Sequence, residues 1–321
     1  MTFKFQTFDR SKLIINKLAK RKSNISLSNI LSLKSVSGID QTINIIAQKI
    51  NNARKCHASV VLMMGAHVIR AGLQRYIIDM MEQGFISCIA TNGAGLIHDF
   101  ELALVGATTE SVEHYIKDGQ FGLWKETGVI NDIVSEAMCS KSGLGESVGR
   151  AMEKRKFPHR DISIFAAGYR LKIPVTVHVG IGYDIVYEFP NCNGAAYGAT
   201  SYKDFLIFTK ILESLENGVV MNFGSAVMAP EIYLKALSMV RNVANQKNRE
   251  IKNFTTLVCD LYKLPNDFRK EATKDNPSYY FRPWKTMLVR TVADGGESYY
   301  INDSHSETIP KLWTAITHIN D

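Results

Sequence analysis

The stretch from Gly84 to Leu104 constrains the fold of this chain more than any other. Its first part, Phe85–Ala90, is a short apolar run rich in β-forming residues, as in a strand buried on both faces. A turn of small residues follows at Thr91–Gly95, and Ile97–Leu104 then has the pattern of an amphipathic helix. In a parallel sheet such a turn lies at the carboxyl edge, where backbone N–H groups and a helix N-terminus face a bound anion. The glycines either let the main chain approach a phosphate closely or only make a sharp turn.

The same succession of a buried strand and a small-residue turn recurs along the chain. Further buried strands are predicted at Ser59–Met64, Ile173–Val179, Gly218–Phe223 and Thr255–Leu261. Polar side chains lie in or just after these turns: His67, Asn92 with His98 and Asp99, Asp184, and Ser225. Because such turns meet at one edge of an open parallel sheet, we expect an α/β fold with a site where they converge.

The periodicity between the strands predicts the remaining elements. Apolar residues at helical spacing indicate helices, which we place at Gly38–Arg54, Val68–Gln83, Tyr202–Leu215 and Thr308–Ile319. The small residues of Asn191–Thr200 predict a flexible loop, and Thr286–Thr291 and Glu297–Ile301 are predicted to be short β segments. Residues 1–36 are predicted to form an N-terminal arm that docks on its own body or on a neighbouring subunit, and residues 37–321 a single domain.

The composition argues against several classes of protein. The net charge is +7, but the basic residues have no interleaved aromatic residues, so solvated helix faces explain them better than nucleic acid binding does. The five cysteines lack the spacing of a disulfide framework or a zinc site, and no metal is expected. There is no apolar run of about 18 residues and no secretory signal, so we expect a cytoplasmic protein without a membrane partner.

Lys285 is the strongest candidate for covalent chemistry. It follows Arg282 and Trp284, between an aromatic run and a predicted β segment. A lysine packed against Trp284 and close to Arg282 would be partly desolvated and repelled by a like charge, and both effects favour the free amine that acts as a nucleophile. Alternatively, Lys285 is a surface lysine whose stem covers the aromatic residues.

Two further polar sites follow predicted strands. Asp184 could hold a cationic substrate or cap the element after it, and the cluster Asn302–His305 could bind a ligand or only supply the N-cap of the last helix. The sequence has no Ser-His-Asp order, HExxH, Walker motif or paired carboxylates that would define a known reaction.

Five segments in order resemble the deoxyhypusine synthase family and its bacterial homospermidine-synthase-like relatives, from about residue 55 to the C-terminus. IATNGAGLIHDFELAL resembles the family's Thr-Ala-Gly-Gly segment, VTVHVGIGYDIVYEF its Thr-Asp-Gly-x-x-Gly-Asp segment, and MNFGSAVMAPEI its glycine-triplet turn. RPWKTM resembles the Trp-Gly-Lys segment that holds the catalytic lysine, and SYYINDS resembles the Tyr-Ala-Asp-Ala-Ser nucleotide-binding segment.

The resemblance implies one large Rossmann-like parallel sheet with helices on both faces, in a homotetramer that binds NAD near its subunit interfaces. Family members oxidise spermidine and pass its aminobutyl group, through an imine on the lysine, to a protein lysine or to a small amine. By resemblance, Lys285 forms the imine and Asp184 holds the amine. NAD is then expected to be lined by Thr91, Asn92, Gly93, Gly224, Ser225, and Asn302 or Asp303. The arm resembles an extension that can reach a neighbour's active site.

Several positions depart from the family's pattern and bear on the substrate. Ile97 and His98 replace an acidic pair, Val179 replaces an aspartate, and few acids precede Lys285. Because desolvated ammonium groups need carboxylate partners, His98 and Arg282 suit a substrate that bears a carboxylate or phosphate better than they suit a polyamine. With Trp284, these residues and Asp184 form the predicted substrate site. The sequence therefore predicts an NAD-dependent transferase acting on a small amine, or else a nucleotide-binding paralogue without catalysis.

Overall fold

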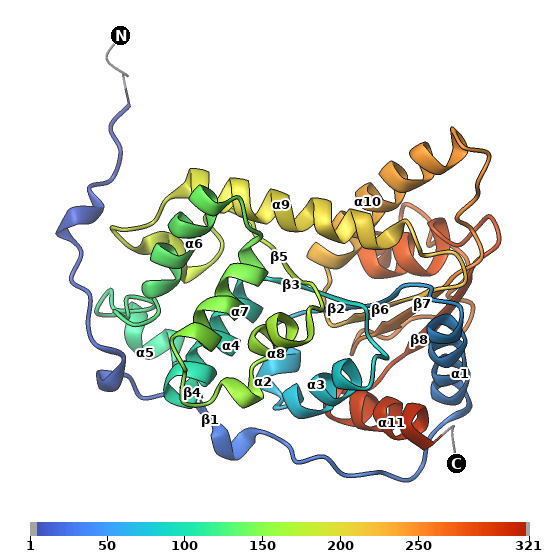
Figure 1. Cartoon of the computed structure of the whole chain (residues 1–321), viewed down its shortest axis with the longest axis horizontal. Coiled ribbons are helices and arrows are strands. Elements are labelled where there is room, and N and C mark those ends of the chain that lie inside the picture. The colour runs from blue at the N-terminus through green and yellow to red at the C-terminus, as the bar shows by residue number, and fades with distance from the viewer. Residues whose placement is uncertain (1–4, 319–321) are drawn as a thin grey trace.

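The computed structural model describes residues 5–318 and contains a six-stranded sheet in which every strand runs parallel (Figure 1). Its strands, in spatial order, are β5 (Val175–His178), β3 (Cys88–Asn92), β2 (Val60–Met64), β6 (Val219–Phe223), β7 (Thr255–Cys259) and β8 (Glu297–Ile301). The α/β fold with one large parallel sheet, predicted from the sequence, is therefore confirmed.

The central strands are buried on both faces, which explains their uninterrupted apolar sequences. All the residues of β2, β6 and β7 are buried. Along β2, Leu62 and Met64 join the core on one face of the sheet, whereas Val61 and Met63 join the core on the other. β6 pairs residue by residue with both β2 and β7, so the apolar side chains of the three strands lie in register.

The strand order creates a topological switch point between β2 and β6. Along the chain, the sheet first grows from β2 through β3 to β5, and then adds β6, β7 and β8 on the other side of β2. This is the order of dinucleotide-binding folds, in which a ligand binds outside the carboxyl ends of the strands where the direction of growth reverses. The loops after β2 and β6 border this position.

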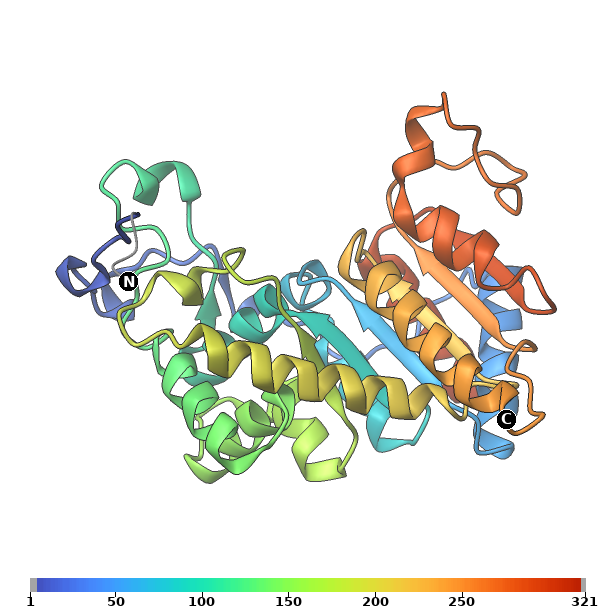
Figure 2. The same ribbon diagram turned by 90° about the horizontal axis from the view of Figure 1, so that it is seen from above.

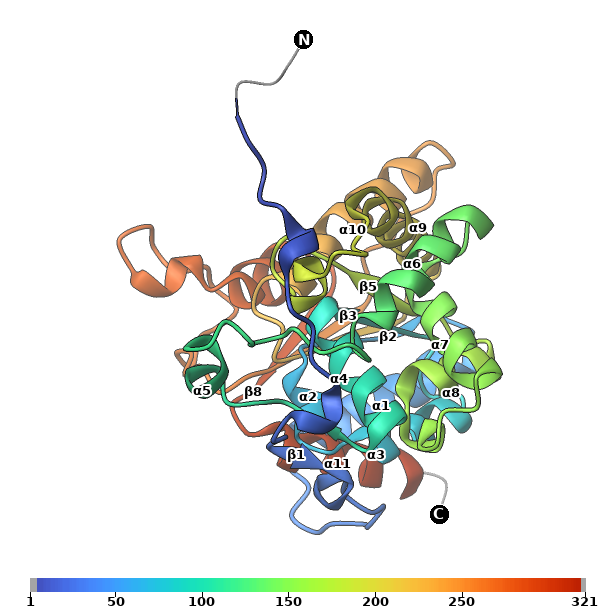
Figure 3. The same ribbon diagram turned by 90° about the vertical axis from the view of Figure 1, so that its left-hand side faces the viewer.

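Helices cover both faces of the sheet, as Figure 3 shows. One face carries α1 (Gln41–Lys55), α3 (Gln74–Glu82), α4 (Gly93–Val105), α7 (Leu144–Lys154), α8 (Ile164–Leu171) and α11 (His305–His318). The other carries α10 (Met228–Asn245), most of α9 (Gly194–Leu212) and the π-helix Pro283–Arg290. The remaining helices are α2 (His67–Arg70), α5 (Val112–Ile116) and α6 (Val129–Ser140).

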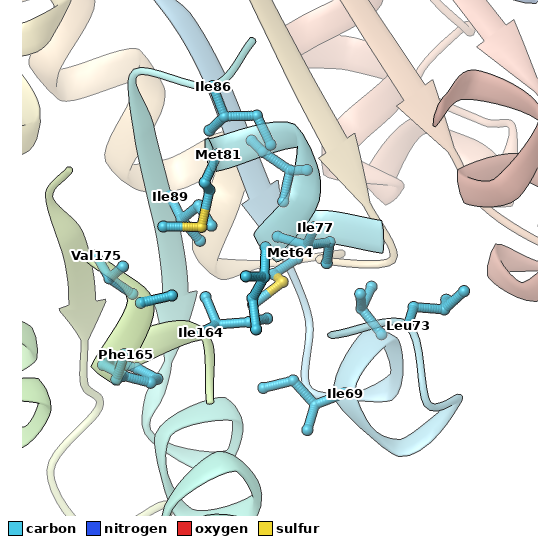
Figure 4. Packing of buried hydrophobic residues seen from close by; sticks show 14 of the residues in the cluster. Met64, Ile69, Leu73, Ile77, Met81, Ile86, Ile89, Ile164, Phe165 and Val175 are labelled. Carbon is cyan, nitrogen blue, oxygen red and sulfur yellow. The ribbon is translucent and has the colours of Figure 1, made fainter. Parts of the chain in front are cut away.

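The larger core lies between the sheet and the helices of the first face. Figure 4 shows Met64 of β2 and Ile89 of β3 among side chains of α3 and α8, including Ile77, Met81 and Ile164. These side chains are almost completely buried, so they anchor the strand ends from which the loops of the carboxyl edge extend.

The N-terminal segment docks along the body of the same chain. Its short strand β1 (Ile25–Ser26) pairs antiparallel with β4 (Ala107–Thr108), and Asn16 forms a bridge with Trp124. Arg21 reaches into the body and forms an ion pair with Glu101 of α4 in which both side chains are buried. Residues 1–4 of the predicted arm lie outside the described residues, and its boundary at residue 36 stays a prediction.

Two predicted elements have a different structure. The stretch Thr286–Thr291 is not a β segment but lies largely in the π-helix, which packs against β7 and α10. The predicted loop Asn191–Thr200 instead provides the first turns of α9. The helix begins there because the side chain of Asn193 accepts a hydrogen bond from the backbone N–H of Ala196 and caps it.

The predicted helix Val68–Gln83 is divided into α2 and α3. Gly72 has a φ of +76°, and a Cβ there would lie 1.9 Å from the carbonyl oxygen of Asn29. The close approach of the N-terminal segment therefore requires glycine at the break. The strand predicted at Phe85–Ala90 begins later, at β3, and the last helix begins three residues before the predicted Thr308; the predicted end at Ile319 lies outside the described residues.

Between residues 5 and 318, none of the helices combines the length and the apolar character needed to cross a membrane.

We predict that Arg21→Ala destabilises the protein strongly. The guanidinium and the carboxylate of Glu101 are both buried, and removing one partner leaves an uncompensated buried charge, which costs roughly 3–5 kcal/mol. Urea unfolding monitored by circular dichroism measures the change. Lys12→Ala is the matched control, because the Lys12–Asp9 pair of the same segment is exposed and should change stability by less than about 1 kcal/mol. Equal stability of the two variants would contradict docking of the segment on its own body.

Candidate functional site

A cavity of about 590 Å³ opens at the carboxyl edge of the sheet, beside the first turns of α4. Its wall combines the N-terminal segment, α2, α4, the stretch between β4 and α5, and the loop after β5. The polar side chains that line it include Arg21, Arg70, His98, Glu110, Asp184 and Glu188. We call it the acidic cavity, because three of its carboxylates, those of Glu110, Asp184 and Glu188, form no ion pair within residues 5–318.

Burial makes the carboxylates of the acidic cavity hard to ionise. It raises the pKa of Asp184 to about 6, and burial together with the negative charge of Glu110 raises the pKa of Glu188 to about 7. Among residues 5–318, neither of these two carboxylates has a hydrogen-bond or ion-pair partner. Burial also raises the pKa of Glu110, although Trp124 Nε1 and the backbone N–H of Gly122 donate hydrogen bonds to it. A cationic ligand would supply the partner that Asp184 and Glu188 lack.

The two arginines that line the same cavity both donate hydrogen bonds to other side chains of the protein. Arg21 donates to both oxygens of Glu101, at 2.9 and 2.8 Å. Arg70 donates to Nε2 of His67, at 3.2 Å, from an exposed position on α2. The cavity therefore has more unpaired carboxylates than unpaired cations, and Arg70 is the exposed, positively charged side chain at its rim.

Asp184 lies against the N-terminus of α4. A Cβ on Gly93 would lie 2.1 Å from Oδ2 of Asp184, so glycine is required for this approach. Asn92 caps the helix by accepting a hydrogen bond from the backbone N–H of Gly95, at 3.0 Å. The hydroxyl oxygen of Thr91 is buried and has no partner among the described residues. The structure thus brings Thr91, Asn92, Gly93 and Asp184 together, with His98 one turn further along the helix.

Thr109 gives independent evidence of strain in the wall of the acidic cavity. Its φ is +64°, a left-handed conformation that β-branched residues rarely adopt. Its hydroxyl is buried and, in the described part of the chain, lacks a hydrogen-bond partner. Strained backbone and unsatisfied polar groups concentrate at functional sites, where a ligand completes the bonding.

A second group of predicted residues surrounds the switch point. The loops after β2 and β6 touch there: a Cβ on Gly65 would lie 2.6 Å from the carbonyl oxygen of Gly224. Gly224 has a φ of +67°, and a Cβ on it would lie 2.4 Å from Nε2 of His305. Nδ1 of His305 is buried without a partner within residues 5–318. Ser225 uses its hydroxyl to accept a hydrogen bond from the backbone N–H of Ala229 in α10.

Asn302 and Asp303 follow β8 on the far side of the same edge. The amide of Asn302 donates to the carbonyl oxygens of Asp260 and Tyr262, at 3.0 and 3.3 Å, and so ties the loop after β7 to the end of β8. Asp303 accepts a hydrogen bond from the backbone N–H of Ser304, at 2.7 Å, and pairs with Lys311 at 3.5 Å. Both side chains therefore also have local structural partners.

The third group, Arg282, Trp284 and Lys285, lies in or next to the π-helix, away from the acidic cavity. None of the three lines that cavity. Lys285 is buried, and its Nζ lies 3.3 Å from the ring centroid of Tyr279 and 3.8 Å from Oε1 of Glu271. Its aromatic partner is thus Tyr279, in place of the Trp284 that the sequence suggests.

The other expected contacts of Lys285 also differ. The indole N–H of Trp284 donates to the carbonyl oxygen of Phe268, and its ring packs in the core of the second sheet face. Arg282 pairs with Glu231, so its charge is already compensated. Figure 2 shows that residues 260–282 and α5 project from the same edge of the sheet at its opposite ends.

Sequence reasoning missed Arg21, Arg70, Glu110 and Glu188. Glu188 alone carried a usable signal, because it follows Asp184 by one short turn in the same segment. The other side chains reach the cavity only through tertiary packing. No group of three or more His, Cys, Asp or Glu side chains in the described part of the chain is arranged to hold a metal ion.

Comparison with known proteins identifies the class of fold. A sequence profile described as "Arginine dihydrolase ArgZ-like, C-terminal, Rossmann fold" matches residues 44–142. The structure of unliganded AgrE aligns with a TM-score of 0.54 at 14% identity, covering 89% of this chain and 34% of that one. The structure of ArgZ, an arginine dihydrolase from cyanobacteria, aligns with a TM-score of 0.50 at 12% identity, covering 88% and 34%. This chain therefore has a Rossmann-type α/β fold.

The particular resemblance is to the deoxyhypusine synthases, as the five motifs predict. "Probable deoxyhypusine synthase 2" of Methanosarcina acetivorans is 22% identical over 217 residues, which cover 60% of this chain and 61% of the relative. The chain thus spans less than two thirds of that relative and about a third of ArgZ and AgrE. AgrE is also known as a ternary complex with ornithine and NAD+, whose TM-score to this chain is 0.50 at 14% identity, covering 89% and 34%.

We predict that Asp184→Asn stabilises the ligand-free protein above pH 7 and leaves it unchanged near pH 4. The pKa of Asp184 is higher in the folded protein, about 6, than its ordinary value of 3.8, so ionisation of this group lowers stability as the pH rises through that interval. Above it, the asparagine variant should be more stable by roughly 1–2 kcal/mol, given about 1.4 kcal/mol per pKa unit and partial solvent screening. Urea unfolding at several pH values measures the difference.

Asp118→Asn serves as the control, because Asp118 is exposed and its replacement should leave the pH profile unchanged. An Asp184→Asn profile parallel to that of the unmodified protein at every pH would show that the carboxylate of Asp184 already has a partner.

Proposed function

We propose that this protein is an NAD-dependent enzyme that acts on a small amine and transfers its aminoalkyl group, as deoxyhypusine synthase-like proteins do. The observation that carries the proposal is the acidic cavity, in which the partly buried carboxylates of Asp184 and Glu188 have no cationic partner among residues 5–318. An ammonium group bound there would ionise both carboxylates and gain charge-assisted hydrogen bonds.

A dinucleotide fits the loops around the switch point. The strand order is that of dinucleotide-binding folds, and the buried Thr91 Oγ1 and His305 Nδ1 are polar atoms without partners among the described residues, on either side of the loop after β2. Arg70, on the helix after β2, supplies positive charge for phosphate groups. The predicted NAD residues lie along this edge: Thr91, Asn92, Gly93, Gly224, Ser225, Asn302 and Asp303.

NAD, when bound, would accept a hydride from the carbon that bears the substrate's amine. This chain's own contribution is to hold that carbon in place: Asp184 binds one ammonium group and Glu188 a second one. Arg70 belongs both to the helix after β2 and to the wall of the acidic cavity, so the proposed cofactor and substrate positions are neighbours. Arg70 would also pair with the carboxylate of a basic amino acid, and AgrE is known with ornithine and NAD+.

The structure supports a role for Lys285 only if a second copy of the chain provides it. Lys285 does not line the acidic cavity of its own chain. Exposed apolar side chains occur both near the π-helix, at Leu261 and Tyr280, and on the loop that carries Asp184, at Ile181 and Tyr183. We propose that these surfaces meet in a homo-oligomer, which would bring a partner's lysine to the cavity.

In that arrangement Lys285 would attack the imine carbon of the oxidised substrate. The Nζ–C bond forms, the original C–N bond breaks, and the departing amine takes up the proton that Nζ gives up. Glu271, with Oε1 at 3.8 Å from Nζ, orients the side chain before the reaction.

A nucleotide-binding paralogue without catalysis is the second candidate, and one observation favours it. The ammonium group of Lys285 already has the face of Tyr279 and the carboxylate of Glu271 as partners, as in a structural lysine. This candidate shares the switch-point loops but needs no free amine on Lys285.

Borohydride trapping decides between the two candidates. We expect sodium borohydride, added to protein with NAD+ and spermidine or ornithine, to fix an adduct on the peptide that contains Lys285, detected by mass spectrometry. Lys285→Ala should abolish both the adduct and turnover, whereas Lys263→Ala, in an exposed position before the same segment, should keep them. Binding of NAD+ without adduct or turnover for any amine would favour the paralogue.

A binding measurement tests the acidic cavity directly. We expect Asp184→Asn to weaken binding of spermidine or ornithine roughly 10–100-fold, because hydrogen bonds to charged groups contribute about 1.5–3 kcal/mol, while the affinity for NAD+ stays the same. Isothermal titration calorimetry measures both affinities. Asp118→Asn is the exposed control, and unchanged amine affinity in Asp184→Asn would exclude Asp184 from the amine site.

A further inference from the structure

His98 is held by a chain of hydrogen bonds that begins in the N-terminal segment. Its Nδ1 lies 2.8 Å from the hydroxyl oxygen of Thr108, and that hydroxyl donates to Oε2 of Glu101 at 2.7 Å. Glu101 in turn receives two hydrogen bonds from Arg21 and one from Thr127, at 2.6 Å. Thr108 and Glu101 are almost completely buried, so water does not compete for these bonds.

The direction of each bond in this chain follows from its chemistry. Four hydrogen bonds, two of them from a guanidinium, converge on Glu101, so its carboxylate is ionised and both oxygens only accept. The hydroxyl of Thr108 has one proton and gives it to Glu101. Toward His98 its oxygen can therefore only accept, and the proton of that bond must lie on Nδ1 of His98.

His98 carries no second proton at neutral pH. Burial lowers the pKa of His98 to about 4, and the positive charges of Arg70, Arg21 and His67 act in the same direction, while the charge of Glu101 opposes them. Nε2 is then the unprotonated nitrogen of a neutral ring. It forms no hydrogen bond with residues 5–318, and His98 belongs to the wall of the acidic cavity.

We propose that Arg21, Glu101 and Thr108 are positioning residues that fix His98 as its Nδ1–H tautomer, so that Nε2 presents a lone pair to the acidic cavity as an acceptor for a ligand N–H. This inference rests on the proposed function and deepens it, because it adds a neutral acceptor beside the carboxylates. In the opposite tautomer, Nε2 would carry the proton and could no longer accept a hydrogen bond from the ligand.

The consequence is selectivity for ligands rich in N–H donors. Asp184 and Glu188 accept hydrogen bonds when ionised, and Nε2 of His98 accepts without adding charge. A primary ammonium or guanidinium end satisfies such a set. Arg21 is not available as a donor to a ligand end that carries only acceptors, because both of its terminal nitrogens donate to Glu101.

The tautomer can be measured without any ligand. In protein labelled with ¹⁵N on its eight histidines, two-dimensional spectra that connect ring nitrogens to ring carbon-bound protons show which nitrogen carries hydrogen, and His98→Gln identifies the signals of His98. At pH 7 we expect one protonated nitrogen, Nδ1, and one unprotonated nitrogen, Nε2. Protonation at Nε2, or at both nitrogens, in the unmodified protein would overturn the proposal.

Two threonine variants test the cause. Thr108→Val removes the hydroxyl, so His98 should no longer be confined to its Nδ1–H tautomer. Thr127→Val is the matched control, because it removes another hydroxyl bonded to Glu101 that does not contact His98, and it should leave the tautomer unchanged. Thr108→Ser restores a hydroxyl and should restore the tautomer. A Thr108→Val protein that keeps Nδ1–H would overturn the role of Thr108, and if that variant does not fold, the spectrum of the unmodified protein and Thr108→Ser still decide.

Titration with spermidine separates this inference from the proposed function. A shift of the Nε2 signal of His98 on addition of spermidine supports the acceptor role. Binding of spermidine in calorimetry without a shift would overturn that role while the amine site stands. Absence of any binding, with the Nδ1–H tautomer present, would count against the amine function and against Nε2 as its acceptor, but not against the positioning chain.

Discussion

Parallel strands impose the main constraint on this structure, because each must return to the same end of the sheet before the next can begin. All carboxyl ends therefore lie along one edge, and every strand-to-helix loop meets there. The cores on both faces fix the strands so firmly that the loops are held in place even where they are strained. Gly93 and Gly224 make closer approaches than a side chain would allow, and Thr109 holds a conformation that β-branched residues rarely adopt.

Desolvated charge explains why the site has two distinct halves. Where an arginine and a carboxylate are buried together, as Arg21 and Glu101 are, the charges satisfy each other and tie the N-terminal segment to the body. Where partly buried carboxylates lack a cation, as those of Asp184 and Glu188 do within residues 5–318, ionisation is unfavourable unless a ligand brings positive charge. The first arrangement fixes the segment in place, and the second is the basis of the proposed amine site.

The acidic cavity also changes the interpretation of the departures from the deoxyhypusine synthase pattern. His98 and Val179 stand where the family motifs have acids, and the sequence alone therefore suggests a loss of amine-binding capacity. Glu110 and Glu188 lie outside the matching positions of those motifs, yet both line the cavity beside Asp184. Negative charge in the cavity is thus supplied from outside the positions that match the motifs.

The sequence by itself determined the parallel sheet, because uninterrupted apolar runs followed by glycine-rich turns are compatible with few other folds. It also placed Asp184 and the stretch Thr91–Gly95 at the carboxyl edge, where the loop after β5 and the junction of β3 with α4 lie. Only the tertiary structure decided that Arg21 and Glu110 join the same cavity as Asp184, because these residues approach one another through packing of segments that no local pattern relates. It likewise decided that Lys285 lies in a π-helix away from that cavity, since the apolar residues around it suit a buried helix as well as a strand.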